Sequence, residues 1–484
     1  VMEEAQRVAG GIPEEELARR DDWRERFVFT IDPVDAKDFD DAILVRKLEH
    51  GWELAVHIAD VAHYVKPDGA LDKEAVARGN STYLVDRVLP MLPPELSNGI
   101  CSLRPHEDRL TCAAVIRFNK KGELGKTRFV KAVINSRARL NYGEAQAFLA
   151  DAGLVKPDDV DAQAALVEGV DNREEVGEAV AGAWELAKVL RQRRFRNGAL
   201  DLEMPEVRMV LDDMGQPTGY KREEYNESHQ LIEEFMLVAN EAVALAIRQA
   251  EKPGIYRIHE DPEADKLAEF AEVAESHGFK PGDLTNRKNI QKLLDDAKGQ
   301  VSEFAIKMGL LKSLKRAAYA DEPLGHYGLV KDDYCHFTSP IRRYADLIMH
   351  RALEPLLRNP PKTLDQVPSK LHCRDIADHI STTERVSASA EVATHRLKLM
   401  QWLEAGSQLA NPPEFAGVIT DVRKLGLMVE ATEIMQRGVV KREAFPVGDW
   451  RLDAGRARYV SRDGELVMGE TIRMVVEHVD MERG

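Results

Sequence analysis

Five aspartates fall within ten consecutive residues near the start of the chain, in the segment 30–42. They are Asp32, Asp35, Asp38, Asp40 and Asp41. Residues 27–31 before them and 43–45 after them are apolar and mostly β-branched or aromatic, which indicates a short buried strand on each side. The acidic segment is therefore expected to be a loop held between two packed strands.

Carboxylates that are crowded into one folded loop repel one another. Two unit charges about 4 Å apart repel by roughly 1 kcal/mol in water and by several times more inside a protein. A cation removes this repulsion, and hard oxygen ligands with open coordination positions suit Mg²⁺ or Mn²⁺. Because a divalent ion held by several aspartates activates water and neutralises phosphate, the segment favours phosphodiester hydrolysis.

The aspartates have two plainer interpretations. A calcium-binding EF-hand loop is a poor match, because the sixth position counted from Asp38 is Ile43, where that loop needs glycine. A solvated acidic turn is the usual explanation for such a cluster. The apolar flanks weaken this second interpretation, which stays open.

Four segments together resemble a known family. The first is Thr-Ile-Asp-x5-Asp-x-Asp-Asp-Ala at 30–42, which is similar to the signature of the RNase II/RNase R (RNB) exoribonucleases. The others follow in the family's order: His-Ile-Ala-Asp-Val at 57–61, Val-Leu-Pro-Met-Leu-Pro at 88–93, and His-Phe-Thr-Ser-Pro-Ile-Arg-Arg-Tyr at 336–344. The resemblance runs from about residue 27 to the end of the chain and is closer to RNase R than to RNase II.

The resemblance implies an α+β fold with two domains. We expect a linker at residues 1–25, an RNB catalytic domain of mixed β-sheet and surrounding helices at 26–408, and a five-stranded OB-fold β-barrel that binds RNA at 414–484. In the family, cold-shock domains precede the acidic segment, and residues 1–25 contain none.

Alternating apolar residues predict two β-hairpins in the first domain. One is formed by residues 42–48 and 52–59, and the other by residues 110–118 and 128–136. His57 falls on the face opposite Leu54, Val56 and Ile58, so we expect a packed histidine there.

The resemblance also assigns roles in catalysis. It implies that Asp32, Asp38, Asp40 and Asp41 hold one or two Mg²⁺ ions, with Mn²⁺ as an alternative. Among them we assign Asp40 to orienting the water. Tyr83 matches the aromatic residue that stacks on the 3′-terminal base, a contact worth roughly 1–3 kcal/mol per base.

The second chemical centre is the pair Arg342 and Arg343. Ser339 and Pro340 predict that a helix begins here, with free N–H groups that favour an anion. Neighbouring helical residues point roughly 100° apart, so the two arginines cannot share one role. Arg343 is placed to pair with Asp346, which leaves Arg342 for the scissile phosphate, as the resemblance also implies.

Three further RNA contacts are implied by the resemblance. Leu202, in a strand expected to begin at 199–202, stands where the family carries a second stacking aromatic residue, so the base clamp is expected to be one-sided. Glu234, on a helix expected over 229–250, and Glu384, at the start of a helix expected over 383–402, are assigned to the RNA sugar. Complementing a helix dipole and capping a helix remain the plain alternatives for these two glutamates.

Residues 191–196 form the densest basic cluster of the chain. Either these arginines complement the end of a helix, or they form a basic patch on the RNA path.

Composition restricts the partners and the compartment. The net charge of the 484 residues is −16, so RNA is expected to bind in a local channel rather than over the whole surface. No apolar run approaches the ~20 residues that a membrane helix needs. The four cysteines include no CxxC pair, which is typical of reduced thiols in a cytoplasmic protein, and we expect a monomer.

These observations predict an Mg²⁺-dependent, processive 3′→5′ exoribonuclease that hydrolyses single-stranded RNA with a free 3′ end to nucleoside 5′-monophosphates. The alternative is an RNA-binding protein of the same fold without hydrolytic activity. A DNA phosphodiesterase fits the metal chemistry equally well.

Overall fold

The structure, a computed structural model, describes residues 1–156, 170–204, 206–223, 225–300, 302–360, 364–453, 458–462 and 464–481. It has the expected α+β class. Residues 143–195, whose sequence pattern predicts helix, lie partly outside the described residues.

A mixed seven-stranded sheet forms the centre of the first domain. Its spatial order is β1-β8-β7-β4-β3-β2-β9. The strands are β1 (Asp21–Asp22), β2 (Phe29–Asp32), β3 (Asp41–Leu48), β4 (Gly51–Ala59), β7 (Asp108–Asn119), β8 (Leu124–Asn135) and β9 (Ala138–Asn141). The pairs β1/β8 and β2/β9 are parallel and the others are antiparallel. The four middle strands, β8, β7, β4 and β3, are those of the two predicted hairpins.

The alternating pattern places side chains on the two faces as expected. Leu54, Val56 and Ile58 are fully buried in β4. His57 is buried on the other face, where its Nδ1 lies 3.1 Å from Thr111 Oγ1 and its ring meets Trp23 edge-on. Burial lowers the pKa of His57 to about 3, so it is a neutral packed histidine, as predicted.

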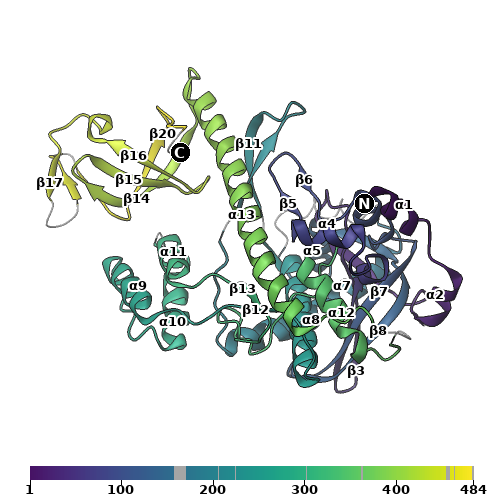
Figure 1. The fold of residues 1–484 in the computed structure, drawn as a ribbon. Helices are drawn as coiled ribbons and strands as arrows, with labels where there is room; N and C mark the ends of the chain where they lie inside the picture. The colour runs from purple at the N-terminus through teal and green to yellow at the C-terminus, as the bar shows by residue number, and fades with distance from the viewer. Residues whose placement is uncertain are drawn as a thin grey trace.

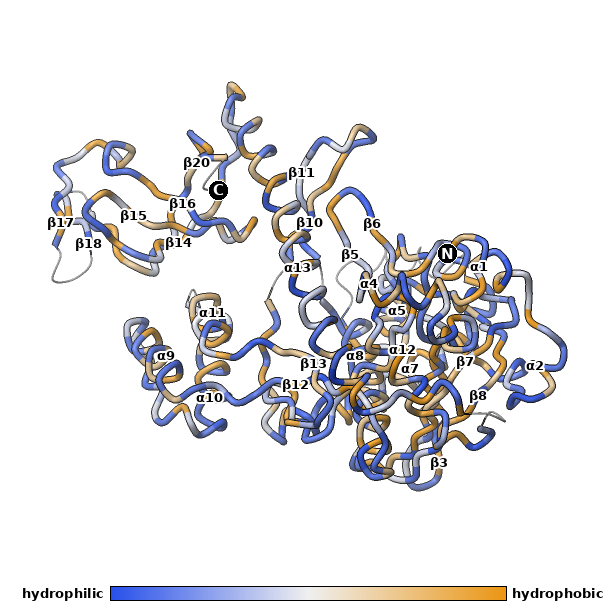
Figure 2. Tube along the Cα trace, viewed as in Figure 1, coloured by the Kyte–Doolittle hydropathy of each residue, from blue (hydrophilic) through white to orange (hydrophobic). Residues whose placement is uncertain are grey.

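Helices pack against this sheet and share its core. Those that contact it or one another most are α5 (Tyr142–Asp151), α7 (Arg173–Arg196), α8 (Glu227–Gln249) and α12 (Tyr344–Leu353). In α8, Leu231, Phe235 and Val238 form the apolar stripe that faces inward. Figure 2 shows hydrophobic segments concentrated in this body.

Short elements complete the first domain. They are α1 (Met2–Val8), α2 (Glu14–Arg19), α3 (Val61–Tyr64), α4 (Ala70–Arg78), β5 (Thr82–Tyr83), β6 (Val88–Leu89), a π-type turn at Glu95–Ile100, β10 (Glu206–Leu211), β11 (Pro217–Glu223), β12 (Tyr256–Ile258), β13 (Ala318–Ala320) and a 3₁₀ turn at Glu354–Leu356.

A small helical lobe has a core of its own. It consists of α9 (Ala264–Ser276), α10 (Arg287–Ala297) and α11 (Glu303–Ser313), with Leu200 buried among them. The strand predicted to begin at 199–202 is wrong: this segment has no strand, and β10 begins only at Glu206.

One long helix, α13 (Lys370–Ser407), joins the first domain to the C-terminal strands (Figure 1). Its first half buries Cys373, Ile376 and Ile380 in the main core, and its second half buries Leu399 and Leu403 beside the C-terminal strands. The helix predicted to open at residue 383 is therefore the middle of a longer one.

The C-terminal strands form two antiparallel sheets around one core. They are β14 (Glu414–Arg423), β15 (Gly426–Ala431), β16 (Gln436–Lys441), β17 (Arg451–Asp453), β18 (Arg458–Val460), β19 (Glu465–Val467) and β20 (Thr471–Val475), with a 3₁₀ turn at Arg442–Ala444. The sheet orders are β16-β15-β14-β20 and β17-β18-β19, and Ile419, Leu427 and Tyr459 pack between them. This arrangement is consistent with an OB fold, although it has more than five strands.

In the part of the chain that the structure describes, no helix is long and apolar enough to cross a membrane. The four cysteines are buried and form no disulfide.

Candidate active site

The acidic loop is anchored between two neighbouring strands. β2 ends at Asp32, β3 begins at Asp41, and the strands pair through Phe29 and Ile43. The loop is also held by a hydrogen bond to a distant segment, because the N–H of Phe39 donates to Ser102 Oγ at 3.1 Å. Asp32 and Asp40 are only 7% and 5% exposed, so a solvated turn is the wrong description of these two acids.

Burial and mutual repulsion make the charged forms of these acids unfavourable. Burial, followed by the charge of Asp41, raises the pKa of Asp32 to about 8. Burial raises the pKa of Asp41 to about 6 and holds that of Asp40 well above its usual range, although Arg342 lowers both. Burial also raises the pKa of Asp38. The four predicted ligands thus lie in one electrostatic neighbourhood that favours a proton or a cation.

The carboxylate oxygens fit a divalent cation. Asp32 Oδ2 and Asp40 Oδ2 are buried and accept no hydrogen bond within the described residues. Such oxygens are hard ligands with unused lone pairs. However, no three His, Cys, Asp or Glu side chains in the described ranges lie close enough together to form a metal-binding group. The acids are gathered in one place, but the structure does not assemble them into a complete ligand set.

Arg342 faces the acids from a segment three hundred residues later in the chain. Its Nε lies 3.6 Å from Asp40 Oδ2, and its Nη2 donates to Ser339 Oγ at 3.1 Å. The side chain is 42% exposed, so it remains accessible to a ligand. Arg343 instead donates to Asp346 Oδ1 at 2.8 Å, as its spacing predicted. The two arginines therefore have separate surroundings.

The predicted start of the helix at Pro340 is wrong, because α12 begins at Tyr344. Arg343 is extended and forms a β-bridge with Asn80, and Tyr344 N–H donates to the carbonyl of Gly79 at 2.9 Å. This strand-like pairing competes with helical geometry. The N–H of Ile341 donates to Asp40 Oδ1 at 2.9 Å, so this backbone donor, which was expected to face an anion, holds the Asp40 carboxylate in place.

A cavity of about 300 Å³ brings three of the predicted residues together: Tyr83, Arg342 and Glu384. Tyr83 is 41% exposed, and its N–H donates to Glu391 Oε1 at 2.8 Å. Burial raises the pKa of Tyr83 to about 12, with Arg342 lowering it and Asp38 and Asp40 raising it, so the ring lies beside the acids.

Glu384 is not a helix cap, because it lies in the interior of α13. Its Oε2 accepts from Arg257 Nη1 at 2.7 Å. Glu384 and Ala388 line both this cavity and a larger groove of about 980 Å³ that runs along α13. The groove also contains four arginines: Arg257, Arg316, Arg385 and Arg396. Basic side chains thus line the approach to the cavity in a chain of negative net charge.

Leu202 and Glu234 do not line this cavity, and their contacts with RNA stay predictions. Leu202 packs against the core of the α9–α11 lobe. Glu234 is 1% exposed and accepts from Arg194 Nε at 2.9 Å. Burial raises the pKa of Glu234 while Arg194 lowers it, so Glu234 belongs to a structural ion pair.

The same contact gives one member of the basic cluster at 191–196 a structural role. Arg194 is 8% exposed and is used by Glu234 and Glu233, so this arginine stabilises the packing of α7 on α8.

Sequence reasoning missed two groups beside the acids. The charges of Asp41 and Asp32 add to burial in raising the pKa of Tyr142, whose ring stacks on His229 with centroids 3.8 Å apart. Arg139 donates to the carbonyls of Pro33 and Val34 at 2.7 and 2.9 Å and so braces the acidic loop. The sequence signal that could have pointed to this region is the Asn141–Glu144 capping box, which starts α5 at Tyr142.

The chain is similar to known proteins. The RNB domain family matches residues 20–359. Ribonuclease R of Aquifex aeolicus is 36% identical over 100% of this chain and 66% of its own length, and that of Thermotoga maritima is 37% identical with the same coverage. Ribonuclease R of Escherichia coli is 33% identical over 99% of this chain and 58% of its own length. The chain thus spans less than two thirds of these relatives.

Solved structures show the same architecture. Mycoplasma genitalium RNase R in complex with ribose methylated single-stranded RNA superposes with a TM-score of 0.83 at 28% identity, over 99% of this chain and 74% of that one. Yeast Ssd1, a pseudonuclease, shares the fold with a TM-score of 0.71 at 18% identity, over 93% of this chain and 53% of that one. The matched domain and the similarity to Ribonuclease R over the whole of this chain show that the chain belongs to the RNB family.

Proposed function

We propose that this chain is a metal-dependent 3′→5′ exoribonuclease that degrades single-stranded RNA processively to nucleoside 5′-monophosphates. The observation that carries the proposal is the approach of Arg342 to the buried acids at a cavity that Tyr83 also lines. The Ribonuclease R relatives and the RNA complex of Mycoplasma genitalium RNase R support RNA as the substrate. The cytoplasm and a monomeric state remain part of this proposal.

Asp32, Asp38, Asp40 and Asp41 would hold one or two Mg²⁺ or Mn²⁺ ions. When bound, such an ion supplies an activated water and neutralises charge on the phosphate. Asp40 orients the water, because the N–H of Ile341 already fixes its Oδ1, and its Oδ2 accepts no hydrogen bond from the described residues.

The other side chains position the end of the RNA. Arg342 clamps the scissile phosphate and stabilises its developing charge with a planar guanidinium. Tyr83 stacks on the last base, and Glu384 meets the sugar, where a contact with the 2′-hydroxyl distinguishes RNA from DNA. The groove along α13 holds the preceding nucleotides, which keeps the strand bound between successive cleavages.

The domain limits at 1–25, 26–408 and 414–484 belong to this proposal. The separate apolar core of the C-terminal strands supports a boundary after α13.

An Asp40→Asn variant tests the proposed chemistry. Asparagine keeps an oxygen that accepts from Ile341 N–H but loses the charge, so turnover is expected to disappear while RNA affinity stays within a few-fold. Release of mononucleotides from uniformly labelled single-stranded RNA with Mg²⁺ measures turnover, and a gel shift measures affinity. Turnover that survives the substitution removes Asp40 from the mechanism.

The second candidate is an RNA-binding protein without hydrolysis. The incomplete ligand set among the described acids is the observation that favours it. In the same assay this candidate predicts a gel shift and no mononucleotides from the unaltered chain. A substrate with deoxyribose at its 3′ end tests the DNA phosphodiesterase alternative.

A further inference from the structure

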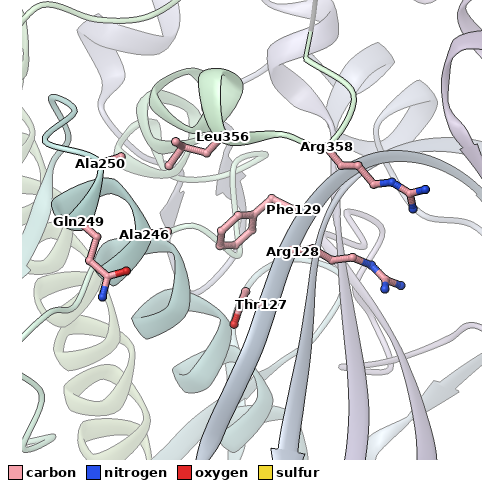
Figure 3. Close-up of a pocket in the computed structure, with 8 residues that line it drawn as sticks. All are labelled: Thr127, Arg128, Phe129, Ala246, Gln249, Ala250, Leu356 and Arg358. Atoms are coloured by element: carbon pink, nitrogen blue, oxygen red, sulfur yellow. The ribbon is translucent and has the colours of Figure 1, made fainter.

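The two faces of the central sheet carry different side chains. Phe129 of β8 lies on the face packed by helices, because it lines a hollow together with the end of α8 (Figure 3). Lys47 of β3 lies on that face too, since its Nζ forms an ion pair of 2.6 Å with helix α7. Successive residues of a strand point to opposite faces, so Arg46 and Arg128 belong to the other face, which we call the outer face.

Two exposed arginines share one acid on the outer face. Arg46 of β3 and Arg117 of β7 are both paired in register with Glu53 of β4, the strand between them. Glu53 Oε1 accepts from Arg46 Nη2 at 2.7 Å, and its Oε2 accepts from Arg117 Nε at 3.0 Å. The arginine side chains are 59% and 52% exposed, whereas that of Glu53 is buried. A single buried carboxylate thus holds two guanidinium groups side by side at the surface.

Two further arginines continue this row beyond β7. Arg128 follows on β8, and Figure 3 shows its guanidinium group pointing away from Phe129, to the same side as that of Arg358. Arg358 lies beside β8, because its N–H donates to the Phe129 carbonyl at 2.8 Å. Its side chain is 65% exposed and has one long contact, 3.5 Å from Nη1 to Asp21 Oδ2. From β3 to the segment of Arg358 the row crosses four strand spacings, roughly 19 Å.

A fifth arginine lies against the same row. Arg26 stacks on the ring of Trp23, with its Cζ 3.7 Å from the ring centroid. Partial burial, followed by the charges of Arg46 and Arg128, lowers the pKa of Arg26, so these side chains share one positive field. Arg128 forms no ion pair within the described residues, and its Nε is buried without a hydrogen-bond partner. The outer arginine patch therefore consists of Arg26, Arg46, Arg117, Arg128 and Arg358, with Glu53 and Asp21 as its acids.

An excess of positive charge in one place favours a bound anion. Like charges that outnumber their acids repel one another, and an anion removes this repulsion. Planar guanidinium groups match the oxygens of phosphate in a bidentate geometry. A lone phosphate reaches only one or two of these arginines, whereas a row of roughly 19 Å needs several phosphates at intervals. The patch therefore fits a backbone that carries repeated phosphates.

The patch offers neither stacking nor apolar contact. Trp23 is 2% exposed and is covered by Arg26. None of the exposed large apolar side chains of the described residues belongs to segment 21–28 or to β3, β4, β7 or β8. Protein interfaces have an apolar core, whereas nucleic-acid interfaces are more polar and more positive. Single strands are held by stacked aromatic side chains as well as by charge, and double-helical RNA by its shape and its phosphates.

We propose that the outer arginine patch binds the phosphate backbone of double-helical RNA. The guanidinium groups contact successive phosphates, and no base is read. That the helix is RNA rests on the proposed function. The patch lies on the face turned away from α7 and α8, and it includes no residue of the candidate active site, so a folded part of an RNA binds here without entering the cavity.

Fluorescence anisotropy with a closed RNA dumbbell tests the surface. The dumbbell is a duplex with a short loop at each end, so it has no 3′ end that could enter the cavity. It is expected to bind the unaltered chain, and Arg26→Ala with Arg128→Ala is expected to weaken binding at least tenfold. The plot of log affinity against log salt is expected to become less steep by about 1.8, which corresponds to two phosphate contacts on a double helix.

Lys47→Ala is the matched control, because it removes the cation that follows Arg46 on β3 and points to the other face. It is expected to leave the affinity and the slope unchanged. Arg316→Ala with Arg385→Ala, in the groove along α13, is also expected to leave dumbbell binding unchanged. Weaker binding in either control overturns the proposal, as does an unaltered chain that binds no dumbbell or a patch variant without effect.

Further variants guard against a folding defect. The alanine pair leaves both partners of Glu53 in place, so its melting temperature is expected to stay unchanged or to rise as like charges are removed. Arg26→Lys with Arg128→Lys keeps the charges and is expected to retain the slope. Arg358→Ala alone is expected to lower the slope by about 0.9. A lysine pair that loses the slope together with its melting temperature means that the arginines support the fold, which overturns the proposal.

Other partners give different results in the same assay. Polyglutamate that displaces the dumbbell at equal charge assigns the surface to an acidic protein, and a single-stranded RNA circle that binds the patch as tightly assigns it to single strands. Either result overturns the duplex assignment. A chain that releases mononucleotides but binds no dumbbell overturns the duplex assignment alone. A chain that binds the dumbbell through these arginines but releases no mononucleotides overturns the proposed function alone.

Discussion

At the scale of single residues, two adjacent arginines have opposite environments. Arg342 is partly exposed and faces Asp40, whereas Arg343 donates to Asp346, whose side chain is fully buried. Removing one partner of a buried pair leaves an uncompensated charge and costs about 3–5 kcal/mol. Removing an exposed charge that acts only on a transition state leaves the fold intact.

We therefore expect Arg342→Ala to lower the turnover number about 100- to 1,000-fold and to change the free energy of unfolding by less than about 0.5 kcal/mol. Arg343→Ala is expected to lower the free energy of unfolding by about 3 kcal/mol or more. Urea denaturation and single-turnover hydrolysis measure the two effects. Equal loss of stability in both variants contradicts the separation of roles.

Asp60 links the end of the N-terminal helix α2 to the sheet through a buried ion pair. Its Oδ2 accepts from Arg20 Nη2 at 2.7 Å, and its other oxygen accepts from Lys131. Burial opposes the charge, but Lys131 and Arg20 prevail and hold the pKa of Asp60 well below its usual range. A lowered pKa stabilises the fold above the unfolded value near 4, and this stabilisation is lost as the pH falls towards the folded value.

Asp60→Asn is accordingly expected to lower the free energy of unfolding at pH 7 by about 3–5 kcal/mol. The difference from the unaltered chain is expected to shrink below about pH 4, where the carboxyl group of the unfolded chain is protonated. Urea titrations across this pH range measure it. Asp86→Asn, in an exposed pair with Arg87, is the control and is expected to leave the free energy of unfolding nearly unchanged at any pH. A difference for Asp60→Asn that is constant with pH contradicts the argument.

At the scale of elements, α13 is the only described helix that contributes to both the main core and the C-terminal core. Ala393 lies between the two buried stretches and is exposed. A proline in a helix interior costs about 3 kcal/mol or more, because it removes a hydrogen bond and collides with the preceding turn. A glycine costs only about 1 kcal/mol.

Ala393→Pro is therefore expected to divide thermal unfolding into two transitions, with the C-terminal strands unfolding first. Ala393→Gly, the matched control, is expected to retain a single transition with a slightly lower midpoint. Differential scanning calorimetry distinguishes them. A single transition in the proline variant means that α13 does not couple the two cores.

The elements also show which features the sequence could predict. The hairpins β3–β4 and β7–β8 were predictable because alternation of apolar residues is a local signal. The start of α12 was not, because Asn80 and Gly79, which pair with Arg343 and Tyr344, are distant in sequence. The ion pair of Glu234 could not be predicted for a similar reason: its partner Arg194 lies forty residues earlier, on another helix.

In the candidate site, too, features with a local sequence pattern were predictable and features that depend on distant residues were not. The acidic loop and the spacing of Arg343 and Asp346 are local patterns, and both were predicted. Tyr142 and Arg139 reach the acids only because β9 pairs in parallel with β2, and no local pattern announces that pairing.

At the scale of the whole molecule, a net charge of −16 coexists with a basic groove along α13. Binding of single-stranded nucleic acid then depends on salt through the contacts in the groove, with a slope of about −0.7 for each phosphate contact. Arg316→Ala combined with Arg385→Ala is expected to make the plot of log affinity against log salt less steep by about 1.4.

Fluorescence anisotropy with labelled single-stranded RNA and the Asp40→Asn chain measures this slope. The control is Lys266→Ala, which removes an exposed lysine paired with Glu269 on α9, and it is expected to leave the slope unchanged. If the arginine variant has an unaltered slope, the groove does not contact the RNA backbone.

The bond from Ile341 to Asp40 joins two parts of the chain that are 301 positions apart. During translation the acids emerge from the ribosome long before the arginine that completes the site. Under the proposed function, a nascent chain cannot cleave RNA until the segment that carries Arg342 has been made and folded. The same proposal implies that the messenger that encodes the chain is spared attack by its own unfinished product.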